Sequence, residues 1–254
     1  MTGPISYIGG KNRLAQKIIS LFPEHTTYVE AFTGGGQVFF HKTPSKVEVL
    51  NDLDSEVVNF FRICQGHHQE LVRHLRYVLV SRRWYELFAQ TPANILTDIQ
   101  RAARFLYLQK NSFGGRVVRQ SYSFHVVQKP GYSPAKIPHL IKQTHERLRA
   151  VQLECLPYEQ ALQKYDRPTT LFYLDPPYWG RQLYKFNFSA SDFRDLARRL
   201  AALKGKFILS LNDLPEVRSL FSSFHLESLE IPYTSQVHAG RRYKELLITN
   251  YSTS

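Results

Sequence analysis

Cysteine is scarce in this sequence, which has only two, Cys64 and Cys155, among 254 residues. Two cysteines cannot form the disulfide framework of a small secreted domain, so a reducing compartment fits the composition. The sequence also has no secretory signal peptide and no apolar run long enough to cross a membrane. We therefore expect a soluble cytoplasmic protein that does not associate with a membrane.

Acidic residues are few relative to basic ones. The chain has 33 Lys and Arg against 21 Asp and Glu, which gives a formal net charge of +12. The excess is concentrated between Arg62 and Arg149, where 15 Lys and Arg stand against 4 Asp and Glu. A solvated helical surface can explain any one of these residues. The bias of a whole segment favours a polyanionic partner, most simply nucleic acid.

Two common kinds of site are not indicated by the motifs. Cys64, His67, His68 and His74 lie close together in the sequence, but their spacing matches no standard metal site. The stretch Gly9-Gly10-Lys11 lacks the upstream glycine and the following Ser or Thr of a triphosphate-binding loop. We therefore expect neither a bound metal nor a nucleoside triphosphate site.

The most informative stretch is an apolar run that ends in an acid, two prolines and two aromatic residues. Residues 170–174 have the continuous pattern typical of a buried strand. Pro176 and Pro177 stop that strand, because proline has no N–H and a fixed φ. Asp175, the Pro176 carbonyl and the Tyr178 ring should then lie at the carboxyl edge of a sheet, where α/β folds bind ligands. The alternative is an ordinary junction, since Asp-Pro often opens a turn.

A related pattern occurs near the N-terminus. A short strand over residues 28–32 leads into Gly34-Gly35-Gly36, and a helix is expected directly afterwards. Glycines between a strand and a helix let the backbone approach a ligand at the positive end of the helix. A strand over residues 47–52 ends in Asp52, the position at which nucleotide-binding α/β folds hold ribose hydroxyls. The glycine turn and Asp52 together indicate an adenosyl ligand, although Asp52 could instead cap a helix over residues 53–61.

The order of the elements predicts an α/β fold interrupted by a basic helical insert. Helices are expected over residues 12–22, 70–80, 82–90, 98–110 and 192–203, and further strands over residues 151–155, 206–211, 224–234 and 244–250. Residues 1–58 and 150–254 would form one catalytic domain, and residues 59–149 an inserted domain. The insert contains an irregular stretch over residues 111–138, whose arginines and aromatic residues suit groove contact and base unstacking.

Together these motifs resemble the Dam-type (D12 class) family of DNA adenine-N6 methyltransferases. The matching pieces follow the family order over almost the whole chain: residues 7–11, 30–36, 51–52, 111–116, 175–178, 210–213 and 244–250. In this family the target-recognition region lies between the cofactor motif and the catalytic motif, as the basic insert does here. The resemblance implies a Rossmann-like methyltransferase sheet that uses S-adenosylmethionine and carries an inserted DNA target-recognition domain.

The resemblance also implies roles for individual residues. The cofactor S-adenosylmethionine would contact Tyr7, Lys11, Glu30, Phe32, Gly34, Gly36, Asp52, Tyr158 and Asp175. Catalysis would depend on Asp175, Pro176, Pro177 and Tyr178. Double-stranded DNA would contact Asn111, Arg116, Arg119, Tyr122 and Lys129. The chain departs from the family at Pro157, where an acidic or polar residue usually precedes the aromatic, which leaves Tyr158 to pack on the adenine ring of the cofactor.

The implied reaction is methyl transfer to the amino group of an adenine flipped out of the duplex. Hydrogen bonds to Asp175 and to the Pro176 carbonyl would draw the amino nitrogen toward tetrahedral geometry, and Tyr178 would stack on the base. Three alternatives are cytosine-N4 methylation, a DNA-binding homologue that has lost catalysis, and methylation of a protein glutamine. The acid at the first motif position favours adenine by resemblance, and the basic insert favours DNA. We expect a monomer. The recognition sequence and the setting (host genome, restriction system or phage) stay open.

Overall fold

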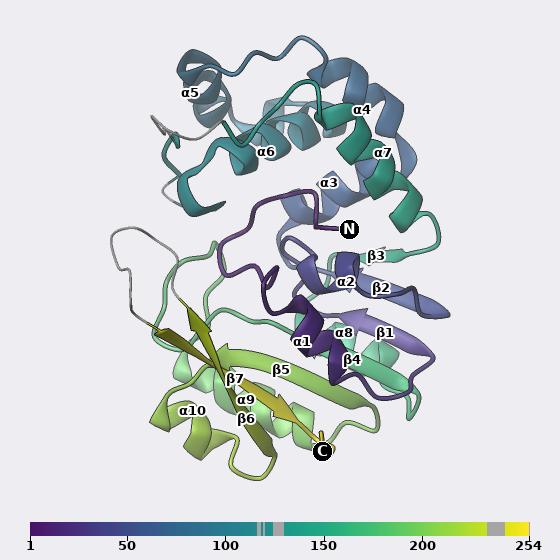
Figure 1. The fold of residues 1–254 in the computed structure, drawn as a ribbon, viewed down its shortest axis with the longest axis vertical. Coiled ribbons are helices and arrows are strands. Elements are labelled where there is room, and N and C mark those ends of the chain that lie inside the picture. The colour runs from purple at the N-terminus through teal and green to yellow at the C-terminus, as the bar shows by residue number, and fades with distance from the viewer. Residues whose placement is uncertain (116–117, 119, 124–129, 233–241, 254) are drawn as a thin grey trace.

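In the computed structural model, a sheet with its covering helices forms the lower half of the molecule, and a layer of helices forms the upper half (Figure 1). The structure describes residues 1–115, 118, 120–123, 130–232 and 242–253. Within these residues the sheet has 7 strands in the order β3-β2-β1-β4-β5-β7-β6. Their bounds are β1 Thr27–Glu30, β2 Val47–Asn51, β3 Gln152–Glu154, β4 Thr170–Leu174, β5 Lys206–Asn212, β6 His225–Pro232 and β7 Arg242–Thr249.

The sheet changes winding direction between β1 and β4. Strand β1 pairs in parallel with both β2 and β4, and the chain continues outward through β3 on one side and β5 on the other. Strand β7 is antiparallel to its neighbours β5 and β6. This arrangement confirms the Rossmann-like fold expected from the sequence. A change of direction of this kind leaves a crevice at the carboxyl edge, where α/β sheets bind ligands.

Alternating residues of the strands pack into two separate hydrophobic cores. Leu171 and Tyr173 of β4 belong to one core, and Phe172 and Leu174 belong to the other. The alternation follows from the two-residue period of a strand, and burial of both faces explains why β4 is apolar throughout. Helices α1 (Ala15–Ser20) and α2 (Gln37–His41) cover the first face, and α8 (Tyr158–Tyr165), α9 (Ala190–Ala201) and α10 (Pro215–Leu220) cover the second.

The chain between β2 and β3 forms the upper layer in Figure 1. Its elements are α3 (Ser55–Gly66), α4 (His68–Leu75), α5 (Arg82–Gln90), η1 (Ala93–Ile95), α6 (Asp98–Asn111), η2 (Phe113–Gly115) and α7 (Ile137–Leu148). Helix α3 packs against α6 and α7. The first core continues into this layer, since Leu171 of β4 and Leu106 of α6 belong to the same cluster. The separation of residues 59–149 as a domain stays a prediction.

Most of the expected elements are present, with three helices that the sequence did not reveal. The helix expected over residues 82–90 has those bounds, whereas the helix expected over residues 70–80 ends at Leu75. The unexpected helices, α7, α8 and α10, begin at prolines: Pro138 and Pro215 lie in a first turn, and Pro157 is an N-cap. Proline is tolerated there because the first N–H groups of a helix have no intrahelical acceptor.

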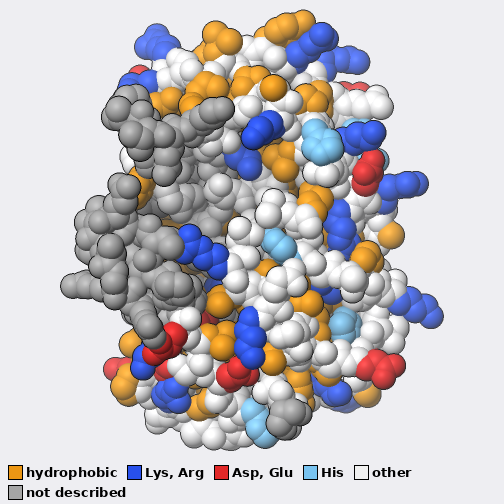
Figure 2. All heavy atoms as spheres, viewed as in Figure 1, with side chains coloured by type: hydrophobic (Ala, Val, Ile, Leu, Met, Phe, Trp, Pro, Cys, Tyr) orange, Lys and Arg blue, Asp and Glu red, His pale blue; other side chains and the backbone are white. Residues whose placement is uncertain are grey.

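The surface of the upper layer carries many basic side chains on the face shown in Figure 2. Both cysteines are free; Cys64 is buried and Cys155 is exposed. Among the described residues, no helix combines the length and the apolar composition needed to span a bilayer. In the same part of the chain, no three His, Cys, Asp or Glu side chains are grouped as metal ligands.

Candidate active site

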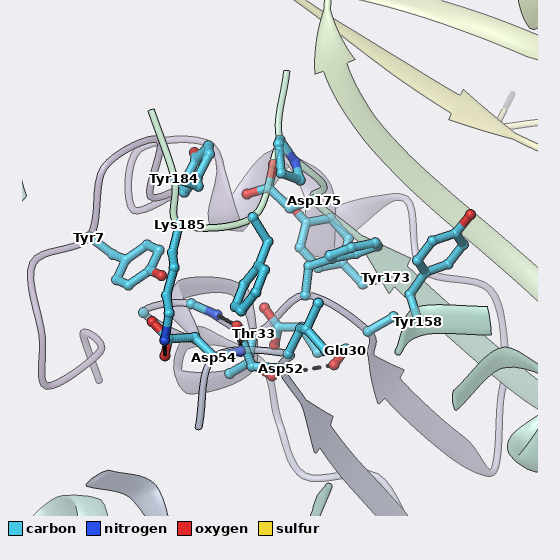
Figure 3. Close-up of a pocket in the computed structure, with 18 of the residues that line it drawn as sticks. Tyr7, Glu30, Thr33, Asp52, Asp54, Tyr158, Tyr173, Asp175, Tyr184 and Lys185 are labelled. Atoms are coloured by element: carbon cyan, nitrogen blue, oxygen red, sulfur yellow. Dashed lines mark hydrogen bonds and ion pairs between the residues drawn. The ribbon is translucent and has the colours of Figure 1, made fainter. Parts of the chain in front are cut away.

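A cavity of about 520 Å³ opens at the carboxyl ends of β1, β2 and β4. In Figure 3, Glu30 and Asp52 lie below, Asp175 lies above, Tyr7 and Tyr184 are at one end, and Tyr158 is at the other. The residues that line the cavity come from segments 7–11, 30–38, 52–54, 156–159, 173–177 and 184–188, with Asp192. The fold therefore brings together the cofactor residues expected from distant parts of the sequence.

The turn after β1 follows a path that favours glycine. Gly34 and Gly36 have φ values of 46° and 62°, in the left-handed region. A Cβ atom on Gly34 would lie 2.9 Å from the Tyr7 ring, so glycine also makes room for this side chain. Gly36 is the N-cap residue of α2, which confirms a glycine turn between a strand and a helix.

Asp52 lies beside this turn. Its carboxylate accepts hydrogen bonds from the backbone N–H of Gly34 at 2.7 Å and of Asp54 at 2.8 Å. The cap of α3 is Asp54, whose side chain accepts from the N–H of Glu56, so the capping alternative for Asp52 is wrong. Burial raises the pKa of Asp52 to about 6, although the two N–H donors oppose the rise. Asp52 thus presents a carboxyl group with a raised pKa on the cavity wall.

Asp175 and Lys11 form a salt bridge over the cavity. The distance from Lys11 Nζ to Asp175 Oδ1 is 2.6 Å, and Lys11 also donates to the carbonyl of Gly9 at 3.0 Å. Burial raises the pKa of Asp175 to about 6, with Lys11 opposing the rise and Glu245 adding to it. Burial lowers the pKa of Lys11, but Asp175, Tyr178 and Glu245 outweigh it and raise that pKa well above its ordinary value. Lys11 therefore stays charged at neutral pH.

The two prolines after Asp175 are followed by Tyr178, whose hydroxyl is held by a hydrogen bond. Pro176 is buried, and Pro177 lines the cavity. The Tyr178 hydroxyl donates a hydrogen bond to Glu245 Oε1 on β7, 2.5 Å away. Lys11 Nζ lies 4.9 Å from the centre of the Tyr178 ring. The corner of carboxylate, prolines and aromatic ring expected from the sequence is therefore present at the end of β4.

Two further polar side chains are buried beside the cavity. Glu30 of β1 stands opposite Tyr173 of β4 in the sheet register, and the Tyr28 hydroxyl lies 3.4 Å from Glu30 Oε2. Burial and the nearby Asp175 raise the pKa of Glu30 well above its usual range. The buried Tyr173 hydroxyl has no hydrogen-bond partner among the described residues. An unpaired buried polar group costs about 1–3 kcal/mol, so the Tyr173 hydroxyl is a candidate contact for a ligand. The sequence did not reveal this residue, because it lies within an apolar run.

The cavity is acidic although the protein is basic. The described residues that line it include six acidic side chains, Glu30, Asp52, Asp54, Glu159, Asp175 and Asp192, and two lysines, Lys11 and Lys185. An excess of carboxylates raises the local concentration of cations and repels polyphosphates. The cavity therefore fits a ligand with positive charge, while the basic surface elsewhere fits a polyanion.

Aromatic rings line one end of the cavity. The ring centroids of Phe32 and Tyr158 are 5.4 Å apart, and those of Phe32 and Phe188 are 5.8 Å apart. The Tyr158 hydroxyl donates to Asp195 of α9. Pro157 is the N-cap residue of α8 and makes no side-chain cap hydrogen bond. This end of the cavity therefore offers flat apolar surfaces of the kind that hold a ring.

One segment of the site was not identified from the sequence. Tyr184 stacks on Tyr7 with ring centroids 6.3 Å apart, and its hydroxyl donates to the carbonyl of Ile8 at 3.1 Å. Lys185 Nζ lies 3.5 Å from Asp54 Oδ1. Residues 184–188 match no motif, so only their position at the cavity reveals them.

The residues expected to contact DNA are only partly covered by the structure. Arg116, Arg119 and Lys129 lie outside the described residues. Asn111 is 2% exposed, and its Nδ2 donates to the carbonyl of Tyr107 one helical turn earlier. In this conformation the Asn111 side chain holds the end of α6, so we do not retain it among the proposed DNA contacts.

Tyr122 lies in the loop that follows α6. It forms an antiparallel bridge with Ser112, and its ring centroid lies 5.3 Å from that of Tyr85. The guanidinium of Arg82 lies 5.1 Å from the centre of the Tyr122 ring. The Tyr85 hydroxyl and Ser112 Oγ are also hydrogen-bonded, at 2.9 Å. Helix α5 therefore supports this loop, and Tyr122 combines a half-buried ring with a nearby positive charge.

The comparison with known families agrees with this geometry. Residues 7–234 match the model of the D12 class N6 adenine-specific DNA methyltransferases. The chain belongs to this family. The methyltransferase therefore uses S-adenosylmethionine to methylate adenine in DNA, which decides against the cytosine and protein alternatives.

Known relatives match most of the chain at low identity. The Type II methyltransferase M1.LlaDCHI of Lactococcus lactis subsp. cremoris is 28% identical over 269 residues, which cover 96% of this chain and 94% of the relative. The Type II methyltransferase M.CviBI of Paramecium bursaria Chlorella virus NC1A is 23% identical over 97% of this chain and 98% of its own. A DNA N-6-adenine-methyltransferase of Escherichia phage P1 is 25% identical over 88% of this chain, which matches only 32% of that larger protein.

Similarity to solved structures is more distant. An rRNA methylase from Streptococcus thermophilus aligns with 94% of this chain and 96% of its own at 9% identity, with a TM-score of 0.41. A likeness at this level carries no argument about the reaction, so the assignment rests on the family match.

Proposed function

We propose that the acidic cavity holds S-adenosylmethionine and that Asp175, Pro176 and Tyr178 receive the target adenine at its edge. The observation that carries this proposal is the position of Asp175. Its carboxylate lies where the cavity meets the end of β4, so it can face a ligand in the cavity and a base outside it. Asp175 and Pro177 line the cavity, whereas Tyr178 continues beyond it.

The cavity residues fit the chemistry of this cofactor. S-adenosylmethionine carries a sulfonium, an ammonium and a carboxylate, so its net positive charge suits a cavity with six acids and two lysines among its described lining residues. We assign the methionine end to Tyr7, Lys11, Glu30 and the glycine turn, the ribose to Asp52, and the adenine to Phe32 and Tyr158. When bound, the cofactor supplies an electrophilic methyl group.

The catalytic corner acts on the amino group of the adenine. That nitrogen is a weak nucleophile because its lone pair is delocalised into the ring. The Asp175 carboxylate and the Pro176 carbonyl would each accept one N–H bond, which holds the nitrogen and localises its lone pair toward the methyl group. Tyr178 would stack on the flipped base and offset part of the unstacking cost, a contact worth roughly 1–3 kcal/mol.

Asp175 is also placed to take the proton that the amino nitrogen gives up after it has formed its new bond to carbon. Burial raises the pKa of Asp175 to about 6. A carboxylate with this pKa is ionised at neutral pH and is more basic than an exposed aspartate. The same group can therefore accept a hydrogen bond before transfer and a proton afterwards.

The basic insert supplies the DNA contacts in this proposal. Its 15 Lys and Arg against 4 Asp and Glu suit a phosphate backbone, and we assign Arg116, Arg119, Tyr122 and Lys129 to DNA. We also propose that the protein acts as a monomer, and we place it in the cytoplasm because its substrate is DNA. Relatives named Type II methyltransferases support a restriction-modification setting.

The test is incubation with unmethylated plasmid and S-adenosylmethionine, followed by mass spectrometry of the digested nucleosides. We expect N6-methyldeoxyadenosine, and sequencing of the modified sites would give the recognition sequence. Asp175→Ala should abolish methylation while DNA binding persists, because the substitution removes one acceptor at the corner and none of the DNA contacts assigned to the insert. Retained turnover in this variant would overturn the assignment of Asp175.

A further inference from the structure

One buried carboxylate has no part in the function described so far. Glu245 of β7 is 3% exposed, and the family-matching segment 244–250 that contains it has been given no role. A single atom, Oε1, accepts hydrogen bonds from the Tyr178 hydroxyl at 2.5 Å and from Ser210 Oγ, and lies 3.4 Å from Lys11 Nζ. Burial of an ionised carboxylate is costly unless partners compensate it; of these three partners, Tyr178 belongs to the catalytic corner and Lys11 is the salt-bridge partner of Asp175.

The sheet register places a second anchor beside the first. Glu245 pairs with Asn212 of β5 across the antiparallel ladder. The Asn212 side chain accepts a hydrogen bond from the N–H of Trp179 and donates one to its carbonyl, each at 3.1 Å. Two neighbouring residues of the β5–β7 pair thus hold two consecutive residues of the loop, Tyr178 by its hydroxyl and Trp179 by its backbone.

We propose that Glu245 is a positioning residue for methyl transfer, which holds the Tyr178 ring and the Lys11 ammonium in place around Asp175 before the base arrives. This inference rests on the proposed function of the Asp175 corner. Glu245 contacts neither the base nor the cofactor in this scheme. It acts through two side chains that do.

The physical effect on Tyr178 is a fixed ring orientation. A tyrosine in a turn can rotate about its side-chain torsions, whereas a charge-assisted hydrogen bond from its hydroxyl to a buried carboxylate selects one orientation. A stacking surface that is already oriented removes an ordering cost from the step in which the flipped base docks. The anchor is rigid because Glu245 lies on a strand that is paired on both sides.

The effect on Asp175 is electrostatic. Lys11 lies between two carboxylates, 2.6 Å from Asp175 and 3.4 Å from Glu245. The charged and titratable groups that face Asp175 are Lys11 from the N-terminal segment, Glu30 from β1, Tyr173 from β4, Glu245 from β7, and Tyr178 and Tyr184 from the loop. After burial, Glu245 is the group that raises the pKa of Asp175. Removal of the Glu245 charge should therefore lower that pKa.

Glu245→Gln weakens the first effect and removes the second, because glutamine keeps the shape and an acceptor oxygen for the Tyr178 hydroxyl but carries no charge. In single-turnover methylation of plasmid DNA at saturating cofactor, we expect the rate to fall roughly 10- to 100-fold, the loss typical of a misplaced reacting group. Affinities for S-adenosylmethionine and DNA should stay within about twofold, since no assigned binding contact is removed. The acidic limb of the pH–rate profile should move to lower pH, which a purely structural residue would not cause.

Two further variants separate positioning from simple damage. Ser210→Ala removes a hydrogen bond to the same oxygen but leaves the Glu245 contacts with Tyr178 and Lys11, so its rate should stay near that of the wild type. Tyr178→Phe keeps the ring and frees it from Glu245. Glu245 acts partly through this hydroxyl. The rate of the double variant with Glu245→Gln should therefore fall, relative to the wild type, by less than the product of the two single-variant losses.

The outcomes are distinct. A wild-type rate and an unmoved acidic limb in Glu245→Gln would overturn the inference, as would losses that multiply fully in the double variant. If Glu245→Gln does not fold, Tyr178→Phe decides alone: a rate within about twofold of wild type overturns the inference, and a slower rate with unchanged DNA affinity supports it. Absence of methyladenine with the wild-type enzyme would instead overturn the proposed function itself.

Discussion

The backbone N–H of Ile8 donates a hydrogen bond to the carbonyl of Gly115, 3.0 Å away. Ile8 belongs to the segment that carries Tyr7 and Lys11, whereas Gly115 ends the turn after α6 in the basic insert. The two backbones pack closely, since a Cβ atom on Gly115 would lie 2.9 Å from the carbonyl carbon of Ser6 and from the amide nitrogen of Tyr7. The turn before the expected DNA-binding arginines thus lies directly against the cofactor segment.

This contact predicts that Gly115→Ala weakens cofactor binding although the residue lies in the insert. The new methyl group must push Ser6 and Tyr7 aside, and we expect a loss of roughly tenfold in affinity for S-adenosylmethionine, equivalent to about 1.4 kcal/mol. Calorimetric titration with S-adenosylmethionine measures this loss of affinity. Gly114→Ala is a matched control, because Gly114 has a similar φ of 64° but a Cβ atom there would meet none of the described residues within 4 Å. Equal effects of the two variants would show that backbone strain alone matters.

Cofactor binding should depend on pH around 6. Burial raises the pKa of both Asp52 and Asp175 to about 6, so each carboxyl group is increasingly protonated below that pH. A cationic ligand favours the ionised forms, lowers these pKa values and releases protons when it binds. The affinity for S-adenosylmethionine should therefore rise as pH increases through about 6 and level off above about 7. Below its pKa, each carboxyl group should contribute a change of up to roughly tenfold in affinity per pH unit.

Proton release can be measured by calorimetry near pH 6, the shifted pKa of both groups, in two buffers that differ in ionisation enthalpy. Asp52→Asn should reduce the number of protons released and also weaken binding, because the ribose hydroxyls lose a charged acceptor. An affinity that stays constant between about pH 5 and 7 would contradict the placement of a cation beside these two carboxyl groups.

The segment over the cavity predicts a graded effect at Tyr184. Tyr184→Phe keeps the stack on Tyr7 and removes the hydrogen bond to the Ile8 carbonyl. We expect a cost of about 0.5–1.5 kcal/mol in cofactor affinity, the usual contribution of one hydrogen bond. Tyr184→Ala removes the ring as well and should cost more. Fluorescence or calorimetric titration with S-adenosylmethionine checks the order, and equal affinities of the two variants would exclude a role for the ring.

DNA binding should be strongly salt-dependent, unlike cofactor binding. The basic segment binds phosphates by releasing counterions, so the logarithm of affinity should fall linearly with the logarithm of salt concentration. Arg116→Ala and Arg119→Ala should each reduce this slope by about one if the residue contacts a phosphate. A residue that reads a base should instead relax sequence preference. Unchanged affinity, slope and site preference in both variants would remove these arginines from the interface.

The sequence alone determined the parts of the site that are local. The end of β4 before two prolines and the glycine turn before α2 are each dictated by neighbouring residues, since proline and glycine act on their own backbone. The motif order and the charge of the insert also sufficed to predict the fold class and the reaction. The same local reasoning missed α7, α8 and α10, because a proline can begin a helix as well as end one.

Only the tertiary structure decided how these pieces meet. Lys11 reaches Asp175, Glu245 reaches Tyr178 and Tyr184 covers Tyr7, although each pair is far apart in the chain. These contacts depend on the order of β1, β4, β5 and β7 in the sheet, and on the register that sets Glu245 beside Asn212. Strand order and register arise from the packing of both sheet faces against their helices, a property of the whole chain that no single segment encodes.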